Sequence, residues 1–154
     1  MLRRNKSTAA RARGAAFAIV ASQYNARYVD SMLRAAQAEF KRAGGGVQVV
    51  RVPGAYEIPV VAARLARSGK FAGIICLGVI LRGQTTHAAH IGEAVTNSLT
   101  AIQLETEVPV IHEVLLLENK EQAEVRCMDR QHNRGQEAAT TALAMAAIMA
   151  QIAS

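Results

Sequence analysis

The chain has 154 residues, a formal net charge of +6 and a hydrophobic content of 51%. This length predicts a single domain with its own core. Residues 1–14 carry five of the 18 basic residues and no acidic residue, so the remaining 13 basic residues nearly balance the 12 acidic ones. With no tryptophan for base stacking, this local charge argues against a nucleic-acid-binding domain and predicts a solvated or subunit-draped basic extension.

Several features of the chain favour a reducing, cytoplasmic location. Residues 1–14 contain charges but no apolar segment followed by a cleavage site, so we expect no secretory signal. No uninterrupted apolar run is long enough to span a membrane. Cys76 and Cys127 stand far apart without a CxxC pair, which predicts two structural thiols. The high apolar content also favours buried contacts between subunits.

The first part of the chain predicts two strands separated by a helix. Residues 15–21 form an apolar run typical of a strand. The apolar positions that follow recur at helical spacing: Leu33, Ala36 and Phe40. The glycines at 44–46 can end this helix, because glycine readily adopts positive φ. Residues 47–52 are apolar and rich in β-branched side chains, which predicts the second strand.

The middle of the chain continues the alternation. Pro59 begins a helix that reaches about Ser68, since proline costs nothing in a first helical turn. Residues 72–80 are continuously apolar, as expected for a strand covered on both faces. A helix at about 87–106 follows, with Ile91, Ala94, Val95, Ser98 and Ile102 on one face.

The last part of the chain predicts a fourth strand at 109–117, a short helix capped by Asn119 and ending at Arg126, and a terminal helix preceded by Gly135. Strands separated by helices imply right-handed crossovers and a parallel sheet between helical layers. Ligands bind beyond the carboxyl ends of such strands. This rule marks residues 24–25, residues 54–57, residues 81–87 and the end of the fourth strand.

The strand-to-helix junction at residues 77–87 predicts an anion site. Unpaired N–H groups of a first helical turn and the positive end of the helix dipole favour a phosphate there. Gly83 allows close approach of the backbone, and Thr85 and Thr86 can add hydroxyl donors. A threonine that only caps the helix is an equally good interpretation.

His87 stands at the mouth of this junction. Histidine is the side chain best suited to moving protons at neutral pH, although a lone histidine at a helix start is more often structural. His90 follows three residues later, but no third ligand stands at metal-site spacing, so we expect no metal.

Four segments in their order and spacing resemble the lumazine synthase family. They are Tyr24-Asn25, residues 52–59 (VPGAYEIP), residues 78–87 (GVILRGQTTH), and residues 108–111 together with the helix ending in Arg126. The match runs without gaps from about residue 15 to 145.

The resemblance implies a flavodoxin-like three-layer α/β sandwich with a four-stranded parallel sheet, formed by residues 15–154 as one domain. It leaves open an N-terminal edge strand added from a neighbouring subunit. It implies the condensation of 5-amino-6-(D-ribitylamino)uracil with 3,4-dihydroxy-2-butanone 4-phosphate to 6,7-dimethyl-8-ribityllumazine, phosphate and water, in riboflavin biosynthesis. It implies no cofactor, and neither a nucleic acid nor a membrane as partner.

The resemblance also implies roles for single residues. His87 would transfer protons, and Tyr24 would stack on the pyrimidine, unless it packs a strand end. Three further groups would contact the substrates: Ala55, Tyr56 and Glu57 the ribityl chain; Val79, Ile80 and Leu81 the ring; Gln84 and Thr85 the phosphate. Core packing explains the strand residues equally well, and Glu57 could be a solvated turn acid.

In the family, the residues matching Arg126 and His112 come from a neighbouring subunit, where Arg126 would complete the phosphate site. Family members form pentamers, which may pair into decamers or close into shells, and the sequence favours neither assembly. His112 departs from the usual phenylalanine, and residues 127–134 depart from a glycine-containing stretch. These departures leave a non-catalytic lumazine or flavin binder as the alternative; an assembly role and a generic flavodoxin-like regulator have less support.

Overall fold

The computed structural model describes residues 15–83 and 86–153. Its elements are β1 (Ala16–Ser22), α2 (Ala26–Ala43), β2 (Gly46–Val52), the 3₁₀ helix η1 (Ala55–Glu57), α3 (Ile58–Arg67), β3 (Gly73–Leu81), α4 (His87–Thr106), β4 (Val110–Leu117), α5 (Lys120–Met128) and α6 (Arg134–Ile152). The strands pair in parallel in the order β2-β1-β3-β4. This architecture confirms the predicted α/β sandwich with a four-stranded parallel sheet.

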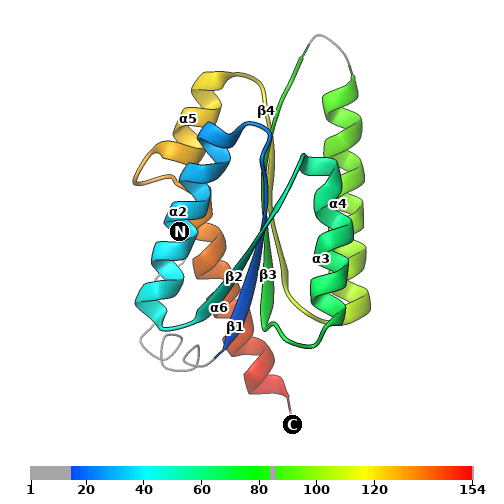
Figure 1. Ribbon diagram of the computed structural model, residues 1–154, viewed down its shortest axis with the longest axis vertical. Coiled ribbons are helices and arrows are strands. Elements are labelled where there is room, and N and C mark those ends of the chain that lie inside the picture. The colour runs from blue at the N-terminus through cyan, green and yellow to red at the C-terminus, as the bar shows by residue number, and fades with distance from the viewer. Residues whose placement is uncertain (1–14, 84–85, 154) are drawn as a thin grey trace.

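Helices cover both faces of the sheet, with α2, α5 and α6 on one side and α3 and α4 on the other (Figure 1). Successive strand side chains point to opposite faces, so β1 contributes to two cores. Phe17 and Ile19 belong to the core under α2 and α6, whereas Ala18 and Val20 belong to the core under α3 and α4. The continuous apolar run of β3 is therefore explained by burial on both faces.

The strands and helices follow the predicted order, and the differences concern their ends. The helix predicted to begin at Pro59 begins at Ile58, after the unpredicted 3₁₀ turn η1. The helix predicted to end at Arg126 continues to Met128. Both thiols are free and buried, as expected of structural cysteines.

The prediction that Gly135 precedes the terminal helix is wrong. Gly135 lies in the first turn of α6, and Asn133 is the cap, its Oδ1 accepting hydrogen bonds from the backbone N–H groups of Gly135 (2.8 Å) and Gln136 (3.4 Å). A Cβ built on Gly135 would lie 2.0 Å from the carbonyl oxygen of Met32 in α2. The glycine is thus needed because two helices approach closely, not because a helix must start.

The basic extension and the edge strand considered for residues 1–14 lie outside the described residues. Within residues 15–83 and 86–153, no helix combines the length and apolarity needed to cross a membrane.

Candidate active site

A large hollow lies at the carboxyl ends of β1, β2 and β3, where the topology places ligands. We call it the main pocket, with a volume of about 890 Å³. Its lining residues are Tyr24, Asn25, Gly54, Ala55, Tyr56, Glu57, Val79, Ile80, Leu81, Gly83, His87, Ala88, His90, Ile91 and Ala94. It therefore brings together eight of the predicted site residues, from four separate segments of the chain.

The turn between β1 and α2 carries the first wall of the main pocket. Asn25 adopts a left-handed conformation with φ of 58°, which asparagine tolerates better than most residues. Its Nδ2 donates a hydrogen bond to the carbonyl oxygen of Val79 at 2.7 Å, which ties this turn to the end of β3. Tyr24 is 74% exposed, so the structure gives it no packing role at the strand end.

The second wall is the turn after β2 and its continuation into η1. The backbone N–H of Gly54 donates to Glu57 Oε2 at 3.0 Å. Glu57 is exposed, and one of its carboxylate oxygens fixes the turn, as a turn acid would, while the residue also lines the pocket. Tyr56, beside it, is 64% exposed and available for contact.

The third wall consists of the end of β3 and the first turns of α4. Val79 is buried and Ile80 and Leu81 are partly buried, so these residues serve the core and the pocket together. His87 is the first residue of α4 and is exposed. Thr86 is the cap residue, but its side chain makes no capping hydrogen bond. The predicted phosphate ligands Gln84 and Thr85 lie outside the described residues.

Four lining residues, all on α4, were not assigned to the site from the sequence: Ala88, His90, Ile91 and Ala94. The helical members could have been found by periodicity, since His87, His90, Ile91 and Ala94 follow the i, i+3, i+4, i+7 pattern of one helix face. His90 is exposed and shares the pocket with His87. In the part of the chain that the structure describes, no three His, Cys, Asp or Glu side chains gather as metal ligands.

His112 lies on β4, outside the main pocket, where both ring nitrogens are engaged. Its Nδ1 accepts a hydrogen bond from the backbone N–H of Val114 at 3.1 Å, and its Nε2 lies 2.7 Å from Thr96 Oγ1 on α4. An acceptor Nδ1 leaves the proton of a neutral imidazole on Nε2, which then donates to Thr96. Burial lowers the pKa of His112, in keeping with this neutral form.

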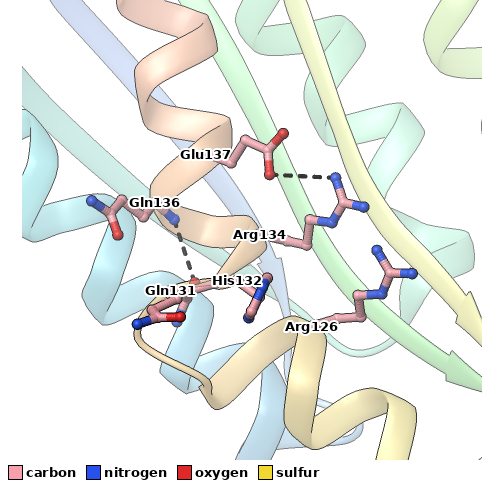
Figure 2. A pocket seen from close by; sticks show the side chains of 7 residues that line it. Arg126, Gln131, His132, Arg134, Gln136 and Glu137 are labelled. Carbon is pink, nitrogen blue, oxygen red and sulfur yellow. Dashed lines mark hydrogen bonds and ion pairs between the residues drawn. The ribbon is translucent and has the colours of Figure 1, made fainter. Parts of the chain in front are cut away.

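Arg126 lines a second, smaller hollow of about 240 Å³ at the junction of α5 and α6, which we call the arginine cavity. Its other lining residues are Gln131, His132, Asn133, Arg134, Gln136 and Glu137. Figure 2 shows the Arg126 and Arg134 side chains extending in the same direction from their two helices. Arg134 Nη1 lies 3.4 Å from Glu137 Oε2, so this arginine is partly neutralised.

The half-buried carboxyl of Glu113, on β4, interacts electrostatically with Arg126, Arg134 and Glu137. Burial raises its pKa to about 7, against the lowering effect of Arg134 and Arg126, and Glu137 raises it further. The neighbourhood of the arginine cavity is thus a mixed cluster in which acids moderate two guanidinium groups.

The two hollows share no lining residue and differ in charge. The described lining of the main pocket contains neither lysine nor arginine, whereas the arginine cavity contains two arginines. A phosphate ester held in the main pocket would therefore have helix-terminal dipoles but no guanidinium from the described lining residues.

Comparison with known proteins agrees with the motifs. A family model described as 6,7-dimethyl-8-ribityllumazine synthase matches residues 14–150. A relative from Xanthomonas oryzae pv. oryzae (strain PXO99A) is 42% identical over 138 residues, covering 88% of this chain and 90% of that protein. A relative from Stenotrophomonas maltophilia (strain R551-3) is 41% identical over 143 residues, covering 90% and 91%. Both relatives are named 6,7-dimethyl-8-ribityllumazine synthase.

Proposed function

This chain belongs to the 6,7-dimethyl-8-ribityllumazine synthase family, and from this premise we propose that its main pocket and its arginine cavity are two halves of one catalytic site, joined between neighbouring subunits. It is a transferase of riboflavin biosynthesis. It condenses 5-amino-6-(D-ribitylamino)uracil with 3,4-dihydroxy-2-butanone 4-phosphate to give 6,7-dimethyl-8-ribityllumazine, phosphate and water.

The main pocket is the half that would hold the ribitylaminouracil. Tyr24 offers an exposed ring for stacking on the pyrimidine, and Val79, Ile80 and Leu81 form an apolar wall of the main pocket. The ribityl hydroxyls would lie along Ala55, Tyr56 and Glu57, where the carboxylate accepts hydrogen bonds. A volume of about 890 Å³ is in the range of small-molecule sites, so it can hold this substrate with room for a second.

The phosphorylated butanone would lie between the two halves. Gln84 and Thr85, with the first amides of α4, would bind its phosphate from one subunit, and Arg126 would bind it from the next. The observation that carries this proposal is the unequal distribution of cations, since two guanidinium groups lie only in the arginine cavity. Two cavities without a common residue can complete one site most simply through a second copy of the chain.

The proposed chemistry requires positioning before it requires strong acids or bases. An amine and a ketone form an imine unaided, so holding them together supplies much of the rate, with effective molarities of ~10⁵–10⁸ M. His87 would take and return protons while water leaves the carbinolamine and the imine forms, and while phosphate is eliminated. Arg126 would stabilise the phosphate as its negative charge grows.

His112 would face the neighbour's substrate ring in the place where the family commonly has phenylalanine. A neutral imidazole with both nitrogens engaged can present its ring face, as phenylalanine does, without adding a charge. On this proposal, the substitution changes the pH behaviour of the subunit more than its recognition of the ring. We further propose a pentameric assembly and a cytoplasmic location.

The product is fluorescent, which gives a direct test. Wild-type protein mixed with both substrates should form it catalytically, and binding of the product without turnover would instead indicate a non-catalytic relative. The shared site is tested by co-refolding Arg126→Gln and His87→Ala subunits. Random mixing should leave about a quarter of the sites with both native residues, so activity should exceed that of either variant alone. No gain in the mixture, in oligomers shown to be mixed, would contradict a shared site.

A further inference from the structure

Arg51 on β2 makes a set of contacts that the function described so far does not use. Its Nε donates to the carbonyl oxygen of Ala21 at 3.2 Å, and its Nη2 donates to that of Ser22 at 2.8 Å. Its Nη1 lies 2.8 Å from Asp30 Oδ1 on α2. Each of the three guanidinium nitrogens therefore has a different partner, on β1 or on α2.

These partners lie on either side of the turn that carries Tyr24 and Asn25. Ala21 and Ser22 are the last residues of β1, and Asp30 is in the second turn of α2. Arg51 thus holds the strand that enters the turn and the helix that leaves it. The side chain is 30% exposed, so solvent screens this ion pair less than a fully exposed one.

Further hydrogen bonds connect the same turn to its surroundings. The backbone N–H groups of Gln23 and Tyr24 donate to the carbonyl oxygens of Val52 (2.7 Å) and Pro53 (3.0 Å). Asn25 donates to Val79 on the other side. Since Tyr24 itself is 74% exposed, the position of its ring depends on the backbone of this turn and little on side-chain packing.

We propose that Arg51 is a positioning residue that fixes the turn bearing Tyr24 and thereby sets the affinity for the ribitylaminouracil. This inference rests on the stacking role of Tyr24 proposed above. It predicts an effect on one substrate only, because the phosphate ligands proposed for the butanone lie elsewhere. Lysine cannot replace Arg51, because its single nitrogen cannot donate to two carbonyl oxygens on β1 and also pair with the carboxylate of Asp30 on α2.

The test measures KM for each substrate, and kcat, from product fluorescence in Arg51→Met and Arg51→Lys. Both variants should raise KM for the ribitylaminouracil by about tenfold, with KM for the phosphorylated butanone within twofold of wild type. Arg67→Met is the matched control. It removes a 3.2 Å pair with Glu105 near the far ends of α3 and α4, and it should leave both KM values unchanged.

A double-mutant cycle tests the route of the effect. If Arg51 acts through Tyr24, Arg51→Met should add less than twofold to KM in a Tyr24→Ala background. Independent, multiplicative effects would overturn the proposal, as would an Arg51→Lys variant with wild-type KM or an equal rise in both KM values. If Arg51→Met does not fold, Asp30→Asn, which weakens the ion pair alone, must raise the same KM selectively. Lack of product from the wild-type protein would instead contradict the proposed function.

Discussion

The main pocket and the arginine cavity differ in every property that matters for binding. The main pocket is several times larger and is lined by apolar, aromatic and imidazole side chains, with a single carboxylate. The arginine cavity is small and carries two guanidinium groups beside acidic neighbours. The apolar and aromatic lining of the main pocket suits a flat heterocycle, and the guanidinium groups of the arginine cavity suit an anionic group. On the proposed function, one folded subunit therefore carries its substrate-binding groups in two separate hollows.

The largest expected effect comes from the cavity side. Arg126→Gln should lower kcat/KM by about 10²–10³-fold, because the charge on the departing phosphate would lose its guanidinium partner. The measurement is steady-state product fluorescence with the phosphorylated butanone as the varied substrate. Arg130→Gln is the matched control, since this exposed arginine belongs to the same region but does not line the cavity. Equal losses of kcat/KM in both variants would show that the region acts only through its overall positive charge and not through a specific contact of Arg126.

The pocket side should be less sensitive to loss of its central residue. His87→Ala should reduce kcat by about 10²-fold, the lower end for a positioned acid or base, and leave a measurable rate from substrate positioning. Single-turnover measurements on preformed enzyme–substrate complexes separate this step from binding. His90→Ala removes the other imidazole, one helical turn away in the same pocket. The same measurement on this variant shows whether the loss of kcat is specific to His87. A His87→Ala enzyme with the wild-type rate would remove His87 from the mechanism.

The contrast between the two hollows also marks what the sequence could predict. The main pocket was predictable because its parts follow strand ends, and the carboxyl ends of parallel strands meet at one edge whatever the side chains are. Periodicity places Ile91 and Ala94 on one helix face, and extending that face back through His90 to His87 could have assigned all three to the site. Asn25 could not be given its bond to Val79, since the two residues are 54 positions apart and the bond depends on a positive φ.

The arginine cavity was harder to predict. Arg126 could be singled out by resemblance, but Arg134 and Glu137 come together with it only because α6 begins at Arg134. The sequence prediction placed Gly135 before that helix, since glycine usually marks a helix boundary. The true reason for the glycine, contact with the backbone of Met32 in α2, is a long-range packing effect that no local pattern encodes.

A smaller effect is expected at the contact between Thr96 on α4 and His112 on β4. Thr96→Val should destabilise the protein by about 0.5 kcal/mol, because His112 Nε2–H would lose its acceptor in an exposed hydrogen bond that water can partly replace. The measurement is the free energy of unfolding in urea at a fixed subunit concentration. Thr100→Val is the matched control, since its hydroxyl donates to the helix carbonyl of Thr96 and does not contact the histidine. Equal losses of unfolding free energy in both variants would show that the hydrogen bond between Thr96 and His112 makes no specific contribution to stability.

The smallest effect is a pH dependence of the free energy of unfolding. Its sign is opposite for His112 and Glu113, which lie on the two faces of β4. His112 has a folded pKa below its ordinary 6.5, so the unfolded chain binds the proton more tightly. Its contribution to stability is present above pH 6.5 and is lost as the pH falls towards the folded pKa. Glu113 has its pKa raised from 4.5 to about 7, so the folded chain binds the proton more tightly. Its contribution is present below pH 4.5 and is lost as the pH rises through about 7.

Single substitutions separate these two slopes, because each residue titrates on its own side of the strand. His112→Phe should flatten the fall in unfolding free energy below pH 6.5, and Glu113→Gln should flatten the fall between pH 4.5 and about 7. Glu113→Gln should also make phosphate binding less dependent on pH, since an ionised Glu113 competes for Arg126 and Arg134. If Glu113→Gln left the stability profile unchanged but altered phosphate binding, the acid would act on the cavity alone. The two faces of β4 would then have separate effects, with His112 linked to folding and Glu113 to the bound anion.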